Sequence, residues 1–249
     1  MSFWGWVAQL LQNYWPMFVR GAGITLLISI VGTIIGFIIG LLTGVVRTIP
    51  IPENAKIIKK IGFKIINALI GIYVAIFRGT PMIVQAMVIY YGAGTLFNIH
   101  LNNIIAGIFI VSINTGAYMT EIVRGGIISI DKGQFEGAHA IGMTHWQTMR
   151  HVVIPQVIRN ILPATGNEFV INIKDTSVLN VISVTELFFN TKSIAGNNFR
   201  YFEAYLITSV IYLIMTLTVT KILSQIERKM DGPKDYVIQL ENKSVEEAK

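Results

Sequence analysis

The chain has 249 residues, of which 53% are apolar and 14% charged, and a formal net charge of +6. Soluble domains usually carry about 25% charged residues, so this composition excludes an ordinary globular domain. The chain contains no cysteine, which excludes disulfides, thiolate metal sites and thiol catalysis.

The first 19 residues are expected to form an interfacial segment ahead of the first membrane span. Trp4, Trp6, Tyr14 and Trp15 are typical of the aromatic belt at a membrane surface. The segment is not a secretory signal, because it lacks a basic start and its apolar stretch is too long.

Two long stretches without Asp, Glu, Lys or Arg follow, at 21–46 and 79–120. Stretches of 18 or more such residues predict transmembrane helices, and lipid leaves no partner for open backbone groups. The sequence therefore predicts an all-α, polytopic membrane helix bundle with a transmembrane domain at 20–228 and a polar tail at 229–249. Its five expected spans are 20–46, 65–92, 103–124, 158–182 and 202–225.

Glycines recur every fourth residue in the first span, at Gly32, Gly36, Gly40 and Gly44. This spacing places them on one helix face, where small residues let a second helix approach closely. We expect the face to serve helix packing rather than to line a transport path.

Lysines and arginines concentrate in the 47–64 loop, around 133–156 and after residue 221, whereas 1–19 and 93–103 contain none. The positive-inside rule then places the N-terminus outside and the C-terminus in the cytoplasm. Lys192 and Arg200, which would lie outside, depart slightly from this pattern.

A polar island at 133–156 interrupts the apolar sequence. Residues 134–141 predict a short helix closed by Gly142, and Thr144 with Gln147 forms a capping-box pattern that starts a second helix before Pro155. His139, His145 and His151 are six residues apart, about 240° of helical rotation, so no metal site is expected.

This island resembles the EAA loop of ATP-binding-cassette importer permeases, with Glu136-Gly137-Ala138, Gly142 and Pro155 at the characteristic positions. Gly137 replaces the middle alanine of that pattern. The resemblance extends over roughly 20–225. Within the family, the chain is similar to the permeases of the polar-amino-acid branch. The further motifs are Arg78-Gly79-Thr80-Pro81, Ala117-Tyr118, Glu121, Arg124-Gly125-Gly126, Gly133-Gln134, Ile154-Pro155-Gln156, Lys174-Asp175-Thr176-Ser177 and Thr185-Glu186-Leu187.

The resemblance implies a type I importer permease fold in a bacterial inner or plasma membrane, with cytoplasmic coupling helices. It implies three kinds of partner: a dimer of cytoplasmic ATP-binding subunits docked on the island, a second permease subunit, and an external amino-acid-binding protein. We expect segment 186–200 to contact the last of these. The chain has no Walker A pattern of its own, so ATP would be bound by the partner, with no cofactor, enzymatic activity or nucleic acid expected here.

Polar residues inside the expected spans are candidates for the substrate path, since charges in a bilayer are costly. Asn114, Tyr118 and Glu121 share one helix face, as do Glu168, Asn172 and Asp175. For Glu168 and Asn172 a substrate path and a bond between helices are both open. Glu121 and Asp175 fit better as structural groups, and Glu121 could pair with Arg124.

Arg78 precedes Gly79-Thr80-Pro81, where proline and glycine should break the helix. A broken helix at membrane depth is tolerated where it lines a cavity. Arg78 and Thr80 are therefore candidates to bind a carboxylate, with a gate or subunit contact as the alternative for Arg78.

The resemblance therefore predicts the permease subunit of an ATP-driven, binding-protein-dependent importer of polar or charged amino acids. An ion-gradient-driven secondary transporter or channel is the alternative, because intramembrane acids suit it equally. An intramembrane enzyme is disfavoured, because the sequence lacks the motifs of a metal or serine hydrolase.

Overall fold

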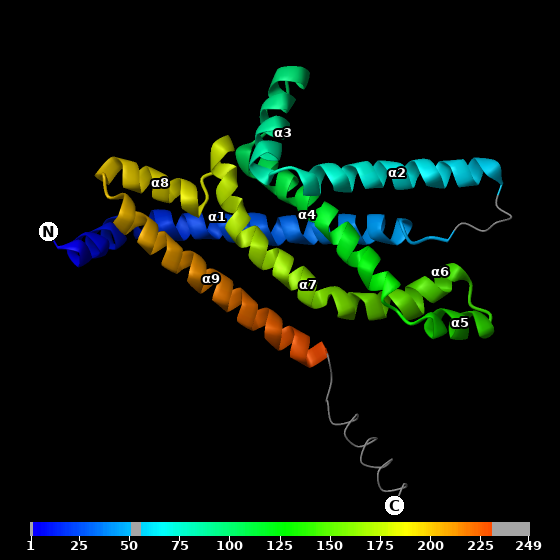
Figure 1. The fold of residues 1–249 in the computed structure, drawn as a ribbon. Helices are drawn as coiled ribbons and strands as arrows, with labels where there is room; N and C mark the ends of the chain where they lie inside the picture. The colour runs from blue at the N-terminus through cyan, green and yellow to red at the C-terminus, as the bar shows by residue number, and fades with distance from the viewer. Residues whose placement is uncertain (1, 51–55, 231–249) are drawn as a thin grey trace, which may run out of the picture.

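The computed structural model describes residues 2–50 and 56–230, and the regular structure in these ranges is helical (Figure 1). The predicted tail therefore lies outside the described residues from 231 on. The long helices are α1 (Phe3–Val46), α2 (Ile57–Gly79), α3 (Met82–Phe97), α4 (Asn103–Ile128), α7 (Ile154–Asp175) and α9 (Tyr201–Met230). The short ones are α5 (Lys132–Ala140), α6 (His145–Thr148), α8 (Leu187–Asn198), a π segment (Met149–Val153) and a 3₁₀ helix (Thr176–Ile182).

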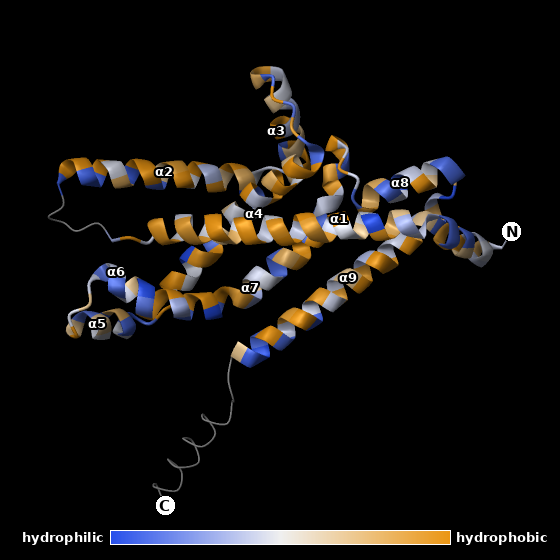
Figure 2. Ribbon diagram, turned by 180° about the vertical axis from the view of Figure 1, so that it is seen from behind, coloured by the Kyte–Doolittle hydropathy of each residue, from blue (hydrophilic) through white to orange (hydrophobic). Residues whose placement is uncertain are grey.

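Four of the described helices are long and apolar enough to cross a membrane: α1, α2, α4 and α9. In Figure 2 the ribbons of these helices are coloured largely as hydrophobic, whereas α5 and α6 are coloured as more hydrophilic. The expected span at 158–182 is instead α7 followed by the 3₁₀ helix, and α7 carries more polar residues than the other long helices. The prediction of a helical membrane bundle is confirmed.

Helix α1 has 44 residues, a length of about 66 Å at 1.5 Å per residue. It runs without a break through both the expected interfacial segment and the first span, and the boundary expected at residue 19 stays a prediction. Ser2 caps its start by accepting a hydrogen bond from the Gly5 N–H.

The glycine face of α1 packs against α4 along its length, as the sequence predicted. A Cβ atom at any of the four glycines would overlap the facing side chain. Gly32 lies against Val111, Gly36 against Thr115, Gly40 against Met119 and Gly44 against Val123. The glycines of α1 and the residues of α4 that face them both recur every fourth position. This matched spacing lets the two helices pack closely as the central pair of the bundle.

The single span expected at 65–92 is two helices, so that boundary prediction is wrong. Helix α2 ends at Gly79, Thr80 is extended, and α3 begins after Pro81. Figure 1 shows α3 leaving α2 at a steep angle. The break has the cause that the sequence predicts, because Pro81 lacks the N–H that would continue the helical bonding.

The island folds as two short helices with the predicted caps. Gly142 has φ +83°, and the N–H groups of Gly142 and Met143 donate to the His139 and Ala138 carbonyls, which is a Schellman ending. Thr144 and Gln147 form the capping box of α6.

The second island helix does not end before Pro155, contrary to the prediction. It continues through the π segment into α7, and Pro155 occupies the first turn of that helix. Proline has no N–H to donate to the preceding turn, and it follows directly on the π segment, where the bonding already departs from the α pattern, with the Ile154 N–H donating to the Met149 carbonyl.

Three apolar clusters lie in series along α1 and α4. The first joins α1, α7, α8 and α9, the second joins α1, α3, α4 and the 3₁₀ helix, and the third joins α4, the π segment and α7. The N-terminus and α8 lie at one end of the bundle, and α5, α6 and the end of α1 lie at the other (Figure 1). We name the latter the basic end, after Arg47, Lys56, Lys59, Lys132 and Arg150.

Candidate functional site

The break between α2 and α3 is held by the buried side chain of Gln85. Pro81 cannot donate to the Phe77 carbonyl, four residues before it, and the Gln85 Nε2 donates there instead at 3.0 Å. The same nitrogen lies 2.9 Å from both the Thr80 carbonyl and the Thr80 Oγ1. A side-chain amide thus replaces the backbone donor that proline removes.

Two predicted path residues belong to this network. The Thr80 hydroxyl donates to the Ile76 carbonyl at 2.8 Å. The Asn114 Nδ2 on α4 donates to the Gln85 Oε1 at 2.9 Å and to the Phe77 carbonyl at 3.3 Å. Their hydrogen bonds fix the break against α4, and their contact with substrate stays a prediction.

Asn172 is buried between three helices. Its Nδ2 donates to the Thr33 Oγ1 of α1 at 2.8 Å and lies 3.0 Å from the Thr115 Oγ1 of α4. The Thr115 hydroxyl also lies 3.2 Å from the Asn172 Oδ1. The alternative of a bond between helices is present in the structure for Asn172, whereas a substrate contact is untested.

Three charged candidates, Arg78, Glu168 and Asp175, remain without such bonds. The Arg78 guanidinium lies 5.3 Å from the centroid of the Tyr118 ring. Glu168 is within electrostatic range of both Arg78 and Asp175. Among the described residues, no ion pair occupies Arg78, Glu168 or Asp175. The arrangement presents a cation and two acids, which suits a zwitterion.

Glu121 is occupied by two arginines at the basic end. Its carboxylate pairs with Arg47 at the end of α1 and with Arg124 one turn further along α4, where the Nη2 to Oε2 distance is 2.9 Å. The ion pair with Arg124 is the one that the sequence spacing suggested. The pair with Arg47 was not predicted, since it depends on how α1 crosses α4.

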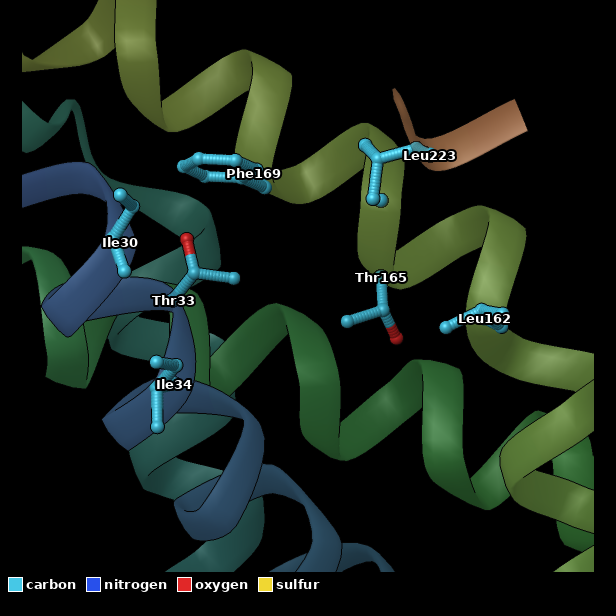
Figure 3. A pocket seen from close by; sticks show the side chains of 8 residues that line it. Ile30, Thr33, Ile34, Leu162, Thr165, Phe169 and Leu223 are labelled. Carbon is cyan, nitrogen blue, oxygen red and sulfur yellow. The ribbon is translucent and has the colours of Figure 1, made fainter. Parts of the chain in front are cut away.

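An apolar cavity of about 210 Å³ opens between α1, α7 and α9. Figure 3 shows its wall, to which Thr33 and Thr165 contribute beside isoleucine, leucine and phenylalanine side chains. The Thr33 Oγ1 accepts from Asn172, and the Thr165 hydroxyl donates to the Ile161 carbonyl. Because both hydroxyls are used within the bundle, this cavity suits hydrocarbon better than a polar solute.

The island offers a surface of mixed character for a partner. Glu136 and Gly137 are exposed on α5, whereas Ala138 is buried and Gly142 makes the turn. Two large apolar side chains nearby, Ile141 and Trp146, are 78% and 65% exposed. Apolar groups outside the lipid-crossing helices mark interaction sites.

The buried acid Glu186 was not predicted as a functional residue, although it belongs to the motif Thr185-Glu186-Leu187. Glu186 caps α8 by accepting from the Phe188 and Phe189 N–H groups at 2.8 and 2.7 Å, and Tyr212 donates to it at 3.1 Å. It lies in the connection to α8, where burial raises the pKa of its carboxyl and the backbone donors oppose that rise. An acid directly before an apolar helix was the available signal.

The second missed residue is Gln85. Its signal was the proline four residues earlier, which leaves a carbonyl in need of a donor. The three histidines of the island do not form a cluster: His139 and His145 line one pocket, while the His151 Nδ1 lies 3.1 Å from the Gln147 carbonyl. No group of three metal-ligating side chains occurs within 2–50 and 56–230.

Comparison with known proteins connects this geometry to transport systems. The chain is 39% identical over 216 residues to the glutamine transport system permease protein GlnP of Escherichia coli (strain K12), covering 86% of this chain and 93% of that protein. It is 34% identical over 158 residues to the arginine transport system permease protein ArtQ of Bacillus subtilis (strain 168), covering 64% and 72%.

A solved structure shares the fold at higher coverage. The crystal structure of an amino acid ABC transporter with histidines superposes with a TM-score of 0.78 at 36% identity, covering 92% of this chain and 99% of that chain. Residues 60–232 match the family described as binding-protein-dependent transport system inner membrane component. The chain therefore belongs to this family of inner membrane transport components.

Proposed function

We propose that this chain is the permease subunit of an ATP-driven importer of polar or charged amino acids. The observation that carries the substrate class is the set of Arg78, Glu168 and Asp175, of which Arg78 lies at the α2–α3 break and none forms an ion pair within the described residues. Arg78 can hold an α-carboxylate bidentately, and the acids suit an α-ammonium. The names of the relatives support amino acids as cargo.

The ATPase partner would dock on the island. Exposed Glu136, Gly137, Ile141 and Trp146 supply a mixed apolar and charged surface there, and Gly142 and Pro155 set the angle between the docking helix and α7. In this proposal the island transmits nucleotide-driven movement into α7, which carries Glu168 and Asp175. Transport then depends on two states of the bundle that the ATPase and the binding protein both bias.

A second permease subunit, identical or paired, would complete the path. The flank of α2 and α3 is apolar and exposed, with Ile72, Ile76 and Val88 more than half exposed. One chain therefore supplies half of a lined path. An external binding protein would deliver cargo near α8, within segment 186–200, at the end opposite the island.

The proposed topology places the N-terminus outside and the basic end in the cytoplasm. A reporter that is active only outside the membrane, fused after residue 249, should give no signal. A strong signal would invert the topology. The outcome of this fusion does not depend on which solute is carried.

Uptake into proteoliposomes tests the function. The complex with the ATPase and binding protein should accumulate glutamine or arginine only with ATP. Glu168→Gln should raise the concentration for half-maximal uptake by about tenfold, the equivalent of roughly 1.4 kcal/mol. Glu227→Gln, on the last turns of α9, is the matched control. Uptake that needs no ATP and follows an ion gradient would contradict the proposal and indicate a secondary transporter.

Docking is tested by Glu136→Lys in the same preparation. The substitution reverses an exposed charge on α5, so it should abolish stimulation of ATP hydrolysis by cargo while the chain remains folded in the membrane. Arg150→Glu, on the exposed side of the π segment, reverses a neighbouring charge as the comparison. Normal coupling in the Glu136 variant would argue against this docking site.

A further inference from the structure

Another pocket, with basic side chains in its wall, lies at the basic end, where α1, α4 and the island meet. It has a volume of about 420 Å³, larger than the apolar cavity of Figure 3. Its lining contains none of Arg78, Glu168 and Asp175, and the proposed transport path does not use it. Its wall includes Arg47, Arg124 and Lys132, with Ile127, Ile130 and Met149 as its floor.

The pocket holds uncompensated positive charge. Arg47 and Arg124 share the single carboxylate of Glu121, and Lys132 adds a third cation that pairs with no acid in the described ranges. Three cations and one carboxylate leave two positive charges. The neighbouring Asp131 is engaged as the cap of α5, accepting from the Gly133 N–H.

The rest of the wall is apolar. Ile127, Ile130 and Met149 are buried beneath it, with exposures of 5%, 7% and 3%, while Ile128 is 64% exposed at its margin. A small hydrated anion has no apolar surface to bury against these apolar side chains. An anion that carries its own hydrocarbon would bury it here.

The depth of the pocket fits the surface of the bilayer. From the start of α4 at Asn103, Glu121 lies about 27 Å along the helix, close to the thickness of the hydrocarbon core of about 30 Å. Arg47 follows directly on the uncharged stretch of α1 and pairs with Glu121. The cationic groups therefore stand at the level of lipid headgroups.

We propose that this pocket binds the headgroup of an anionic phospholipid. The phosphate would lie among Arg47, Arg124 and Lys132, and the upper acyl chains would cover Ile128. Basic pockets between helices on the cytoplasmic side suit such lipids. The bound lipid bridges α1, α4 and α5, so it would stiffen the joint through which the island moves the bundle.

The experiment measures lipid binding to the purified chain in nanodiscs and by native mass spectrometry, with phosphatidylglycerol and phosphatidylcholine as probes. The chain should retain one phosphatidylglycerol more tightly than phosphatidylcholine. Lys132→Gln should weaken that retention about fivefold, the usual effect of one basic residue at a membrane surface. Lys132→Arg should restore it, because the charge is kept.

Lys229→Gln, in the last turn of α9, is the control for a general loss of basic charge and should bind as the unmodified chain does. Equal retention of the two lipids, or equal losses in the Lys132 and Lys229 variants, would overturn the proposal. Glycerol 3-phosphate tests a soluble phosphate as the ligand: displacement of the lipid by submillimolar amounts would also overturn it. This binding is measured without transport, so its failure leaves the proposed function standing.

Discussion

The side chain of Gln85 donates a hydrogen bond of 3.0 Å to the carbonyl of Phe77, the acceptor that Pro81 leaves without a backbone donor. Gln85 belongs to α3 and Phe77 to α2, so this bond joins the two halves of the broken helix. Asn114 of α4 completes the network by binding both groups. The break is thus a defined corner, and it holds Arg78 beside Tyr118.

Gln85→Leu should destabilise this corner. Leucine has a similar size but no donor, so the carbonyls of Phe77 and Thr80 lose their side-chain partner in a buried place. The expected loss in free energy of unfolding is about 1–3 kcal/mol, measured by denaturation in mixed detergent micelles. Gln12→Leu, at an exposed position of α1, is the control. Equal stabilities of the two variants would contradict the role given to Gln85.

Gly40→Ala should weaken the α1–α4 pair. A Cβ at Gly40 would overlap Met119 and its backbone, and overpacking of this kind costs about 1–3 kcal/mol. Gly23→Ala is the matched control on the same helix, because no atom lies within 4 Å of its added Cβ.

Alanine otherwise favours a helix over glycine by about 1 kcal/mol. The control should therefore be neutral or stabilising in the same unfolding measurement, and the two variants should shift in opposite directions. A Gly40 variant as stable as the Gly23 variant would show that the close packing of these helices is dispensable.

The glycine face, the caps of the island and the Glu121–Arg124 pair were all predictable from the sequence. Each depends on residues within one helix or one turn, where spacing fixes geometry. The position of the α2–α3 break was also visible at Pro81, although the expected span ran through it. Local patterns therefore predicted the helices, but of the expected span ends only three fall within one residue of an α-helix end, at Val46, Asn103 and Tyr201.

The partners across helices were not predictable. Gln85 meets Asn114 across 29 positions, and Arg47 meets Glu121 across 74, because α1, α3 and α4 cross at particular angles. Glu186 is fully buried only because α1 and α9 close over it. The sequence spacing predicts that Asn172 and Glu168 share one face of α7. The hydrogen bonds of Asn172 to Thr33 of α1 and Thr115 of α4 depend on how the three helices pack.

Glu121→Gln should lower the free energy of unfolding more than the removal of either arginine does. The substitution leaves Arg47 and Arg124 adjacent without a carboxylate, whereas Arg124→Gln leaves the Arg47 pair in place. Because these groups are partly exposed, each pair contributes at most about 1 kcal/mol. We expect a loss of about 1–2 kcal/mol for Glu121→Gln and under about 1 kcal/mol for Arg124→Gln.

The salt dependence of unfolding separates this effect from a change in packing. Salt at 1 M screens exposed charges over about 3 Å, so it should narrow the difference between the Glu121 variant and the unmodified chain. A difference that is independent of salt would mean that the carboxylate acts through packing and not through its charge.

Gly142→Ala should impair the island without touching the membrane helices. Gly142 has φ +83°, a conformation that costs a residue with a Cβ roughly 1–2 kcal/mol. The strain would open the Schellman ending of α5 and turn the exposed Glu136 away from its present direction. Stimulation of ATP hydrolysis by cargo should therefore fall severalfold in the reconstituted complex. Gly62→Ala is the matched control, since that glycine of α2 lies outside the island, no atom lies within 4 Å of its added Cβ, and alanine favours the helix. If the Gly142 variant stayed fully coupled, the turn would be a connector with no part in transmission.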